Sequence, residues 1–244
     1  MKILCIIQAR MGSERLRGKV MREILGKPMI TYTLDRTLKS RYIDQVVLAT
    51  SDKDTETPMV EYLTDHGYNV FRGDENNVLS RYVEAEKAYD GDIIMRITGD
   101  CPLIDPVVID EVITYFLAHN FDYVRVDVPD SFIRGFDVEI FTKSALKRVY
   151  EITGEIPGDS PYKEHVTLYM YRHPEEFCVS TFRGSELYNR NYRLCVDTTE
   201  DFQLVTRIYE HFGDRFVNGK DVIRFLDEHP EIAGINQNIE QKHV

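Results

Sequence analysis

The sequence predicts an α/β fold of the Rossmann-like kind, with a mostly parallel sheet sandwiched between helices. Apolar, β-branched runs alternate with helical patterns through the first half of the chain, which is typical of βαβ units. These runs are almost continuously apolar, as expected of strands that are buried on both faces. The 244 residues, 43% of them hydrophobic, suffice for a substantial core in one domain.

The first half divides into alternating strands and helices. Strands are expected at Ile3–Ile7, Gln45–Thr50, Asn69–Phe71, Asp92–Ile97 and Asp122–Val126. Helices are expected at Pro28–Lys39, where the proline suits a first turn, and at Asp54–His66, Val78–Ala88 and Pro106–Leu117. In such sheets ligands bind beyond the carboxyl ends of the strands. A site is therefore expected in the loops after Ala9, Thr50 and Ile97.

The second half is less regular. Strands are expected at Asp137–Phe141, Phe177–Phe182 and Tyr192–Val196, and helices at Lys143–Ile152, Pro161–Tyr171, Thr199–Phe212 and Asp221–Glu228. A loop rich in glycine and proline is expected at Gly154–Pro161. No repeat or linker divides the chain. We expect one domain over residues 1–244, with an irregular insertion at about 129–190 that serves as a lid or dimer arm.

Composition limits the classes of partner. A net charge of -11 and a pI of about 5.1 argue against a nucleic-acid backbone as a ligand. A basic pocket on such an acidic body suits a small anion with a divalent metal, although acidity also serves solubility alone. None of the four cysteines forms a CxxC pair, and no apolar run approaches the roughly 18 residues of a membrane span. We expect a cytoplasmic protein without a membrane partner.

The stretch IIQARMGSERLRGKV, residues 6–20, predicts a loop that binds phosphate. It leaves the first strand, turns at Gly12, and offers Arg10, Arg15, Arg17 and Lys19. Successive backbone N–H groups beside a glycine can form an anion nest. For Arg17 an exposed surface charge is the preferred interpretation.

This loop is not one of the two common nucleotide motifs. Five residues separate Gly12 from Gly18, one more than the Walker P-loop allows, and Val20 stands where that motif has a magnesium-binding hydroxyl. The dinucleotide-binding pattern G-x-G-x-x-G is also absent. A metal ion would therefore need ligands from elsewhere in the chain.

Two aspartates at strand ends are candidate metal ligands. Asp100 follows the strand that ends at Ile97, and Asp197 follows the run Leu194–Val196. Magnesium takes one or two carboxylates together with phosphate oxygens and water. Each acid also has an ordinary interpretation, because Gly99-Asp100 is a common turn and Thr199 would cap a helix that has Glu200 and Asp201 in its first turn.

A histidine in the second half is a further candidate. His165 and Tyr169 lie four residues apart, which places them on one face of the expected helix Pro161–Tyr171. A lone histidine on a helix is more often structural than functional. The residues alone leave both interpretations open.

Several motifs together resemble one family. The run Gln8-Ala-Arg-Met-Gly-Ser-x-Arg-Leu-x-Gly-Lys19, followed by Gly26-Lys-Pro-Met29, resembles the opening of the CMP-sugar synthetases, the acylneuraminate-type cytidylyltransferases. Similarity to the spore coat polysaccharide biosynthesis protein F (SpsF) type extends over nearly the whole chain. It is carried by Arg96–Pro106, Glu164-His-Val-Thr167, Arg172-His-Pro174 and Val196-Asp-Thr-x-Glu-Asp201.

The resemblance implies a fold of the nucleotide-diphospho-sugar transferase type, CTP as donor, Mg²⁺ and often a homodimer. It implies nucleotide contacts from Gln8, Ala9, Arg10, Met11, Gly12, Ser13, Arg15, Lys19, Thr50, Ser51 and Thr98. Asp100 and Asp197 would bind the metal, and Arg15, Lys19 and Asp100 would be catalytic. A sugar pocket within or beside the insertion is expected to hold Arg72, Arg134, Asp137, Glu139, His165 and Tyr169.

The expected reaction transfers CMP from CTP to an acidic sugar and releases pyrophosphate, for cell-surface or spore-coat polysaccharide. Octulosonate enzymes have Gln-Gly-Asp-Glu-Pro where this chain has Thr98-Gly-Asp-Cys-Pro102, which points away from octulosonate itself as the acceptor. The alternatives are a glycosyltransferase, for which Asp52-Lys-Asp54 fits a D-x-D pattern, a pyrophosphorylase that uses another nucleotide or a sugar phosphate, and a nucleotide-binding regulator.

Overall fold

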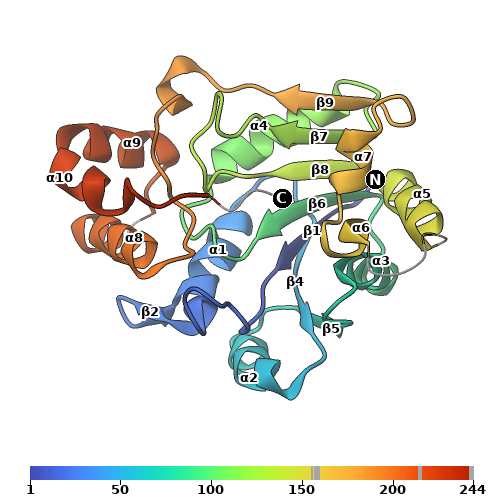
Figure 1. Ribbon diagram of the computed structural model, residues 1–244, viewed down its shortest axis with the longest axis horizontal. Coiled ribbons are helices and arrows are strands. Elements are labelled where there is room, and N and C mark those ends of the chain that lie inside the picture. The colour runs from blue at the N-terminus through green and yellow to red at the C-terminus, as the bar shows by residue number, and fades with distance from the viewer. Residues whose placement is uncertain (155, 157–159, 214–215, 242–244) are drawn as a thin grey trace.

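A seven-stranded sheet forms the centre of the molecule (Figure 1). The computed structural model describes residues 1–154, 156, 160–213 and 216–241. Across the sheet the strands are β5 (Val70–Gly73), β4 (Gln45–Ser51), β1 (Ile3–Gln8), β6 (Ile93–Thr98), β8 (Glu139–Thr142), β7 (Tyr123–Val126) and β9 (Val179–Phe182). Only β8 among these seven runs against the others. The predicted α/β class with a mostly parallel sheet is confirmed.

Helices cover both faces of the sheet, so its strands are buried on both sides. Ile3, Cys5 and Ile7 of β1 pack on one face with α1 (Met29–Thr37), α2 (Thr57–Asp65), α4 (Pro106–Leu117), α8 (Thr199–Phe212) and α9 (Gly219–Glu228). Leu4 and Ile6 pack on the other face with α3 (Val78–Tyr89), α5 (Lys143–Gly154) and α7 (Leu168–Arg172). This arrangement explains the uninterrupted apolar runs in the sequence.

Short elements complete the chain. They are the hairpin β2 (Glu23–Ile24) with β3 (Lys27–Pro28), the helices α6 (Pro161–Glu164) and α10 (Pro230–Ala233), and 3₁₀ turns at Lys19–Met21, Asp54–Glu56, Glu186–Tyr188 and Gly234–Asn236. The C-terminal helices α8, α9 and α10 gather at the end of the sheet toward which β6 points (Figure 1). Within the described ranges, no helix has both the length and the apolar character needed to cross a membrane.

The single helix expected at Pro161–Tyr171 is wrong. The chain forms α6, leaves helical geometry at His165 (φ −103°, ψ 89°) and re-enters a helix at Leu168. Tertiary contacts outweigh the local helical pattern here, because Val166 is fully buried and the Thr167 hydroxyl donates to Glu139 Oε1 at 2.8 Å. The break changes which side chains of this segment face the sheet.

The strand expected at Tyr192–Val196 is also wrong. This segment makes one isolated bridge, between Arg193 and Arg134, instead of a continuous ladder. Its backbone is tied to two separate loops, since Leu194 N–H donates to Arg134 O at 2.7 Å and Val196 N–H donates to Asp100 O at 2.8 Å. The extended segment therefore joins two loops and does not extend the sheet.

The region 129–190 is only partly an insertion. Its strand β8 lies inside the sheet between β6 and β7, and its strand β9 forms an edge beside β7. These strands belong to the main body of the domain. Residues 155 and 157–159, from the expected glycine- and proline-rich loop, lie outside the described residues. A lid or dimer arm formed by the rest stays a prediction.

Gly99 brings two loops of the sheet edge into close contact. A Cβ on Gly99 would stand 2.7 Å from the Ala9 Cβ and 2.8 Å from the Ile30 Cδ1. We expect Gly99→Ala to lower the free energy of unfolding by about 1–3 kcal/mol, measured by urea denaturation, because the neighbours must shift. Gly12→Ala is the matched control, since a Cβ there would meet nothing within 4 Å. Equal midpoints for the two variants would contradict this reading.

Candidate functional site

Three charged side chains from distant parts of the sequence meet beyond the carboxyl end of β6. The Lys19 ammonium lies 2.8 Å from Asp100 Oδ2 and 2.9 Å from Asp197 Oδ1, and it donates to Val196 O at 2.7 Å. Lys19 begins the 3₁₀ turn after the opening loop, Asp100 follows β6, and Asp197 precedes α8. We call Lys19, Asp100 and Asp197 the acidic centre. The sequence predicted each of them as a site residue, and the fold places them in direct contact.

The charges of the acidic centre stabilise one another. Burial by itself would lower the pKa of Lys19, but Asp100 and Asp197 outweigh it and the pKa is raised. Burial likewise opposes ionisation of Asp100, yet the Lys19 charge and hydrogen bond hold the pKa of Asp100 below its ordinary value. Arg15 and Arg193 approach the other oxygen of Asp197 at 3.0 and 2.5 Å. Lys19 and Asp100 are therefore both charged at neutral pH.

The buried side chain of Asp201 holds Arg193 and the backbone of Asp197 in place. Asp201, with no exposed surface, accepts from Arg193 Nε at 3.0 Å and from the Asp197 N–H at 2.9 Å. It also forms a capping box with Thr198, so Thr198 and not Thr199 is the N-cap of α8. The sequence spacing Thr198-x-x-Asp201 could have indicated this box, which sequence reasoning missed.

The opening loop is held in place by Glu56, another residue that sequence reasoning missed. The Met11 N–H donates to both carboxylate oxygens of Glu56, at 3.2 and 3.0 Å, and the Thr50 hydroxyl donates to Glu56 Oε2 at 2.8 Å. Glu56 is buried at the end of a 3₁₀ turn. Its role depends on a contact 45 residues away in sequence, and no local motif indicates it.

The other predicted nucleotide residues surround this loop. Arg10, Gly12 and Arg15 are exposed, as is Arg17, and Ser13 is half-buried. The Ala9 N–H donates to Ala49 O at 3.3 Å, and the buried Ser51 hydroxyl accepts from the Lys53 N–H at 3.4 Å. The loop thus presents cations and open backbone to solvent beside the acidic centre.

A pocket of about 350 Å³ adjoins the acidic centre. Six residues predicted for the site line it, namely Thr98, Asp100, Asp137, Glu139, His165 and Asp197. The predicted Arg134 lines it too, together with Arg96, Arg125 and Tyr171, which were not among the predicted site residues. Because Asp100 and Asp197 line the pocket and also contact Lys19, a molecule bound in the pocket would touch the acidic centre.

Glu139 is locked into the floor of this pocket. It forms an ion pair with Arg96 and accepts hydrogen bonds from the Tyr123 and Thr167 hydroxyls. Burial would raise the pKa of Glu139, but the Arg96 charge outweighs it and the pKa is lowered. Arg96 also donates through Nε to Gln8 Oε1 at 3.1 Å. Gln8 therefore contacts the pocket floor through Arg96.

Two further pocket residues are shifted toward their neutral forms. Burial lowers the pKa of His165 below its ordinary value, with Arg96 and Arg172 acting in the same direction. Burial raises the pKa of Asp137, which accepts from the Gly135 N–H at 2.6 Å and lies 3.9 Å from Arg134 Nη1. At neutral pH His165 can therefore donate and accept hydrogen bonds without adding a charge.

Two residues predicted for the sugar pocket lie outside it. Arg72 on β5 donates through Nη2 to the Asp52 and Lys53 carbonyls, at 2.9 and 2.8 Å, near the edge of the sheet. Tyr169 stacks on His173 with ring centroids 3.8 Å apart and donates to Glu176 Oε1. The position of Tyr169 follows from the helix break at His165, because after this break Tyr171 and not Tyr169 lines the pocket.

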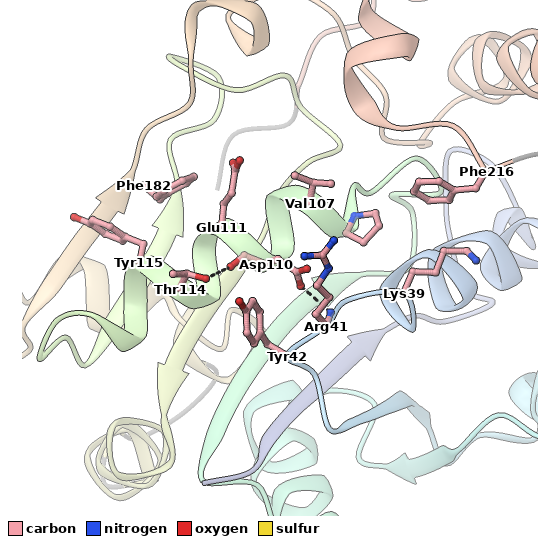
Figure 2. A pocket seen from close by; sticks show the side chains of 11 residues that line it. Lys39, Arg41, Tyr42, Val107, Asp110, Glu111, Thr114, Tyr115, Phe182 and Phe216 are labelled. Carbon is pink, nitrogen blue, oxygen red and sulfur yellow. Dashed lines mark hydrogen bonds between the residues drawn. The ribbon is translucent and has the colours of Figure 1, made fainter.

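A larger hollow of about 630 Å³ lies along α4, away from these residues. Figure 2 shows Tyr115 and Phe182 toward one end of it and Phe216 toward the other, with Tyr42, Asp110 and Arg41 between these ends. None of the residues predicted for nucleotide, sugar or metal lines this hollow. The acidic centre and the smaller pocket, which hold most of the predicted residues, are therefore the candidate functional site.

Comparisons with known proteins show the family of the chain. A family model described as cytidylyltransferase matches residues 4–222. The spore coat polysaccharide biosynthesis protein SpsF of Bacillus subtilis is 33% identical over 95% of this chain and 96% of its own length. A 3-deoxy-manno-octulosonate cytidylyltransferase of Solibacter usitatus is 29% identical, covering 86% of this chain and 95% of its own.

The solved structures include a cytidylyltransferase from Leptospira borgpetersenii that is similar over 100% of both chains, with a TM-score of 0.88 and 31% identity. The match of sequence family, relatives and fold runs through both halves of the chain. The chain therefore belongs to the cytidylyltransferase family of CTP-dependent nucleotidyltransferases.

Proposed function

We propose that this chain transfers CMP from CTP to an acidic sugar, releasing pyrophosphate, to supply the synthesis of a surface polysaccharide. The observation that supports it best is the contact of Lys19 with Asp100 and Asp197 at the junction of a cationic loop and a polar pocket. A triphosphate on the loop and an acceptor in the pocket would meet at this junction. The octulosonate relative supports a sugar acid as the acceptor, and the SpsF relative supports a role in polysaccharide synthesis.

The reaction is a displacement at the α-phosphorus of CTP. The acceptor hydroxyl oxygen forms a bond to that phosphorus, the bond to the oxygen shared with the β-phosphorus breaks, and pyrophosphate leaves with the bonding electrons. The hydroxyl proton passes to water. Such transfers depend mostly on positioning and on neutralising negative charge. Arg10, Arg15 and the N–H groups around Gly12 would neutralise the triphosphate, because they are exposed beside the acidic centre.

The acidic centre fits a magnesium ion. Asp100 and Asp197 already converge on one cation, the Lys19 ammonium, and two carboxylates match the protein ligands that magnesium takes beside phosphate oxygens. When bound, magnesium supplies positive charge to the phosphate oxygens. Lys19 lies where such an ion would approach both carboxylates, so we expect Lys19 to turn toward the phosphates of CTP. Glu56 would keep the loop in register while Lys19 moves.

The experiment measures pyrophosphate release from each of the four nucleoside triphosphates with Mg²⁺ and a panel of sugar acids, sugar phosphates and neutral sugars. We expect release from CTP with a sugar acid. Release with none of the acceptors would overturn the proposal, and release from another nucleotide with a sugar 1-phosphate would favour a pyrophosphorylase. The thermal midpoint should rise with CTP, and more so when magnesium is present. A homodimer stays a prediction.

A further inference from the structure

A row of charged side chains crosses three strands at the floor of the pocket. In the sheet register Arg96 of β6 stands opposite Glu139 of β8, and Arg125 of β7 stands opposite the same Glu139 from the other side. Residues directly opposite one another in paired strands share one face of the sheet. The row therefore reads cation, anion, cation, with one positive charge in excess.

The single anion of this row, Glu139, is already paired with Arg96. The two form an ion pair, Glu139 takes two further hydrogen bonds from Tyr123 and Thr167, and Arg96 also bonds to Gln8. A ligand anion at Arg96 Nη1 would have to displace Glu139 and leave a carboxylate unpaired in the pocket floor, and an anion elsewhere on Arg96 would face a charge that Glu139 already balances. Arg96 is therefore a poor receptor for a ligand anion.

Arg125 is the arginine whose charge is left for a ligand. Within the part of the chain that the structure describes, it forms no ion pair with a carboxylate, and its side chain is exposed in the pocket lining. Its guanidinium lies 4.9 Å from the ring centroid of Tyr171, so a cation–π contact orients it without using its N–H donors. A planar guanidinium with free donors matches the two oxygens of a carboxylate.

The surrounding charges favour a single negative charge over a double one. The pocket lining holds the cations Arg96, Arg125 and Arg134 against the acids Asp100, Asp137, Glu139 and Asp197, which is three against four. Arg134 already approaches Asp137 at 3.9 Å, and His165 is shifted toward its neutral form. A phosphate dianion would face these acids with only one unpaired guanidinium to balance its two charges. A carboxylate carries one charge, which one guanidinium balances.

We infer that the Arg125 guanidinium, stacked on Tyr171, binds the carboxylate of the acceptor and thereby selects sugar acids over neutral sugars and sugar phosphates. This inference rests on the proposed function and adds the residue that decides acceptor class. Hydroxyl groups of the same acceptor would lie near His165 and Asp137, which also line the pocket.

The test is a comparison of steady-state constants for Arg125→Met with the wild type. The acceptor is the 2-keto-3-deoxy sugar acid that turns over fastest, beside its primary amide. We expect the KM for the acid to rise about ten- to hundredfold, as for the loss of a charge-assisted hydrogen-bond pair, while the KM for CTP stays unchanged. In the wild type the amide should be poorer than the acid by a similar factor, and in Arg125→Met the two should become alike. Arg125→Lys keeps the charge but not the fork, and should give an intermediate KM.

Arg148→Met is the matched control. Its guanidinium also lies over an aromatic ring, 4.8 Å from the Phe177 centroid, but it pairs with Glu176 and does not line the pocket. Its acceptor KM should equal that of the wild type. An acceptor KM for Arg125→Met within twofold of the wild type, or a wild type that prefers the amide, a neutral sugar or a sugar phosphate, would overturn the inference and leave CMP transfer standing.

Failure of the proposed function has a different result, namely no pyrophosphate release from CTP with any acceptor. Calorimetric titration with 3-deoxy-manno-octulosonate and N-acetylneuraminate then tests Arg125 by itself. Binding of either acid that Arg125→Met weakens at least tenfold supports the carboxylate site. Equal binding by both proteins, or binding by neither, overturns it.

Discussion

Asp100→Asn is expected to reduce kcat by roughly 10³-fold, about 4 kcal/mol of transition-state stabilisation, without unfolding the protein. Asp100 would hold magnesium beside the reacting phosphate, and an amide is a much weaker ligand than a carboxylate. The fold should survive because Lys19 keeps Asp197 and the Val196 carbonyl as partners. The measurement is pyrophosphate release at saturating CTP and acceptor, over a range of magnesium concentrations.

Asp110→Asn is the control for this substitution. Asp110 is a carboxylate on α4 beside the hollow of Figure 2, where it accepts from the Ser40 hydroxyl at 2.6 Å. Its variant should retain full activity. If Asp100→Asn retained more than a tenth of the wild-type kcat, Asp100 could not be a metal ligand in the reaction.

Asp201→Ala is expected to lower the free energy of unfolding by about 3–5 kcal/mol, since Arg193 loses the fully buried one of its two carboxylate partners. The substitution also removes acceptors for the N–H groups of Asp197 and Thr198 and for Asn236 Nδ2, at 2.9, 3.1 and 2.7 Å. Urea denaturation measures the effect. Asp201→Asn should lose less, because its amide oxygen can still accept from the backbone.

Glu200→Ala is the neighbouring control in the same first turn of α8. Glu200 is exposed, and its removal should barely shift the urea midpoint. Equal midpoints for Glu200→Ala and Asp201→Ala would show that the buried network does not stabilise the fold. Asp201→Ala should also lower activity. Without Asp201, the Asp197 N–H loses its acceptor and Arg193 is no longer held in place beside the Asp197 carboxylate.

The sequence determined the class of fold, most of its elements and the residues of the acidic centre. Alternating apolar runs and helical patterns predicted the parallel sheet, because a strand that is buried on both faces consists almost entirely of apolar residues. Asp100 was predictable because an acid that follows a parallel strand lies at the sheet edge where ligands bind. Asp197 was singled out from an expected strand that the structure does not form, and the bonds of its extended segment to two loops bring it to the same edge. The opening loop was predictable because its cations and glycines are consecutive in the chain.

The tertiary structure alone decided which side chains share the pocket. Strand β8 lies between β6 and β7, out of chain order, and this placement sets Glu139 between Arg96 and Arg125. The helix break at His165 likewise decides that Tyr171, and not Tyr169, lines the pocket. The spacing of apolar residues indicates only which face of each segment is buried. Strand order and register follow from the packing of the whole domain. The ion pairs between segments far apart in the chain are settled by that packing.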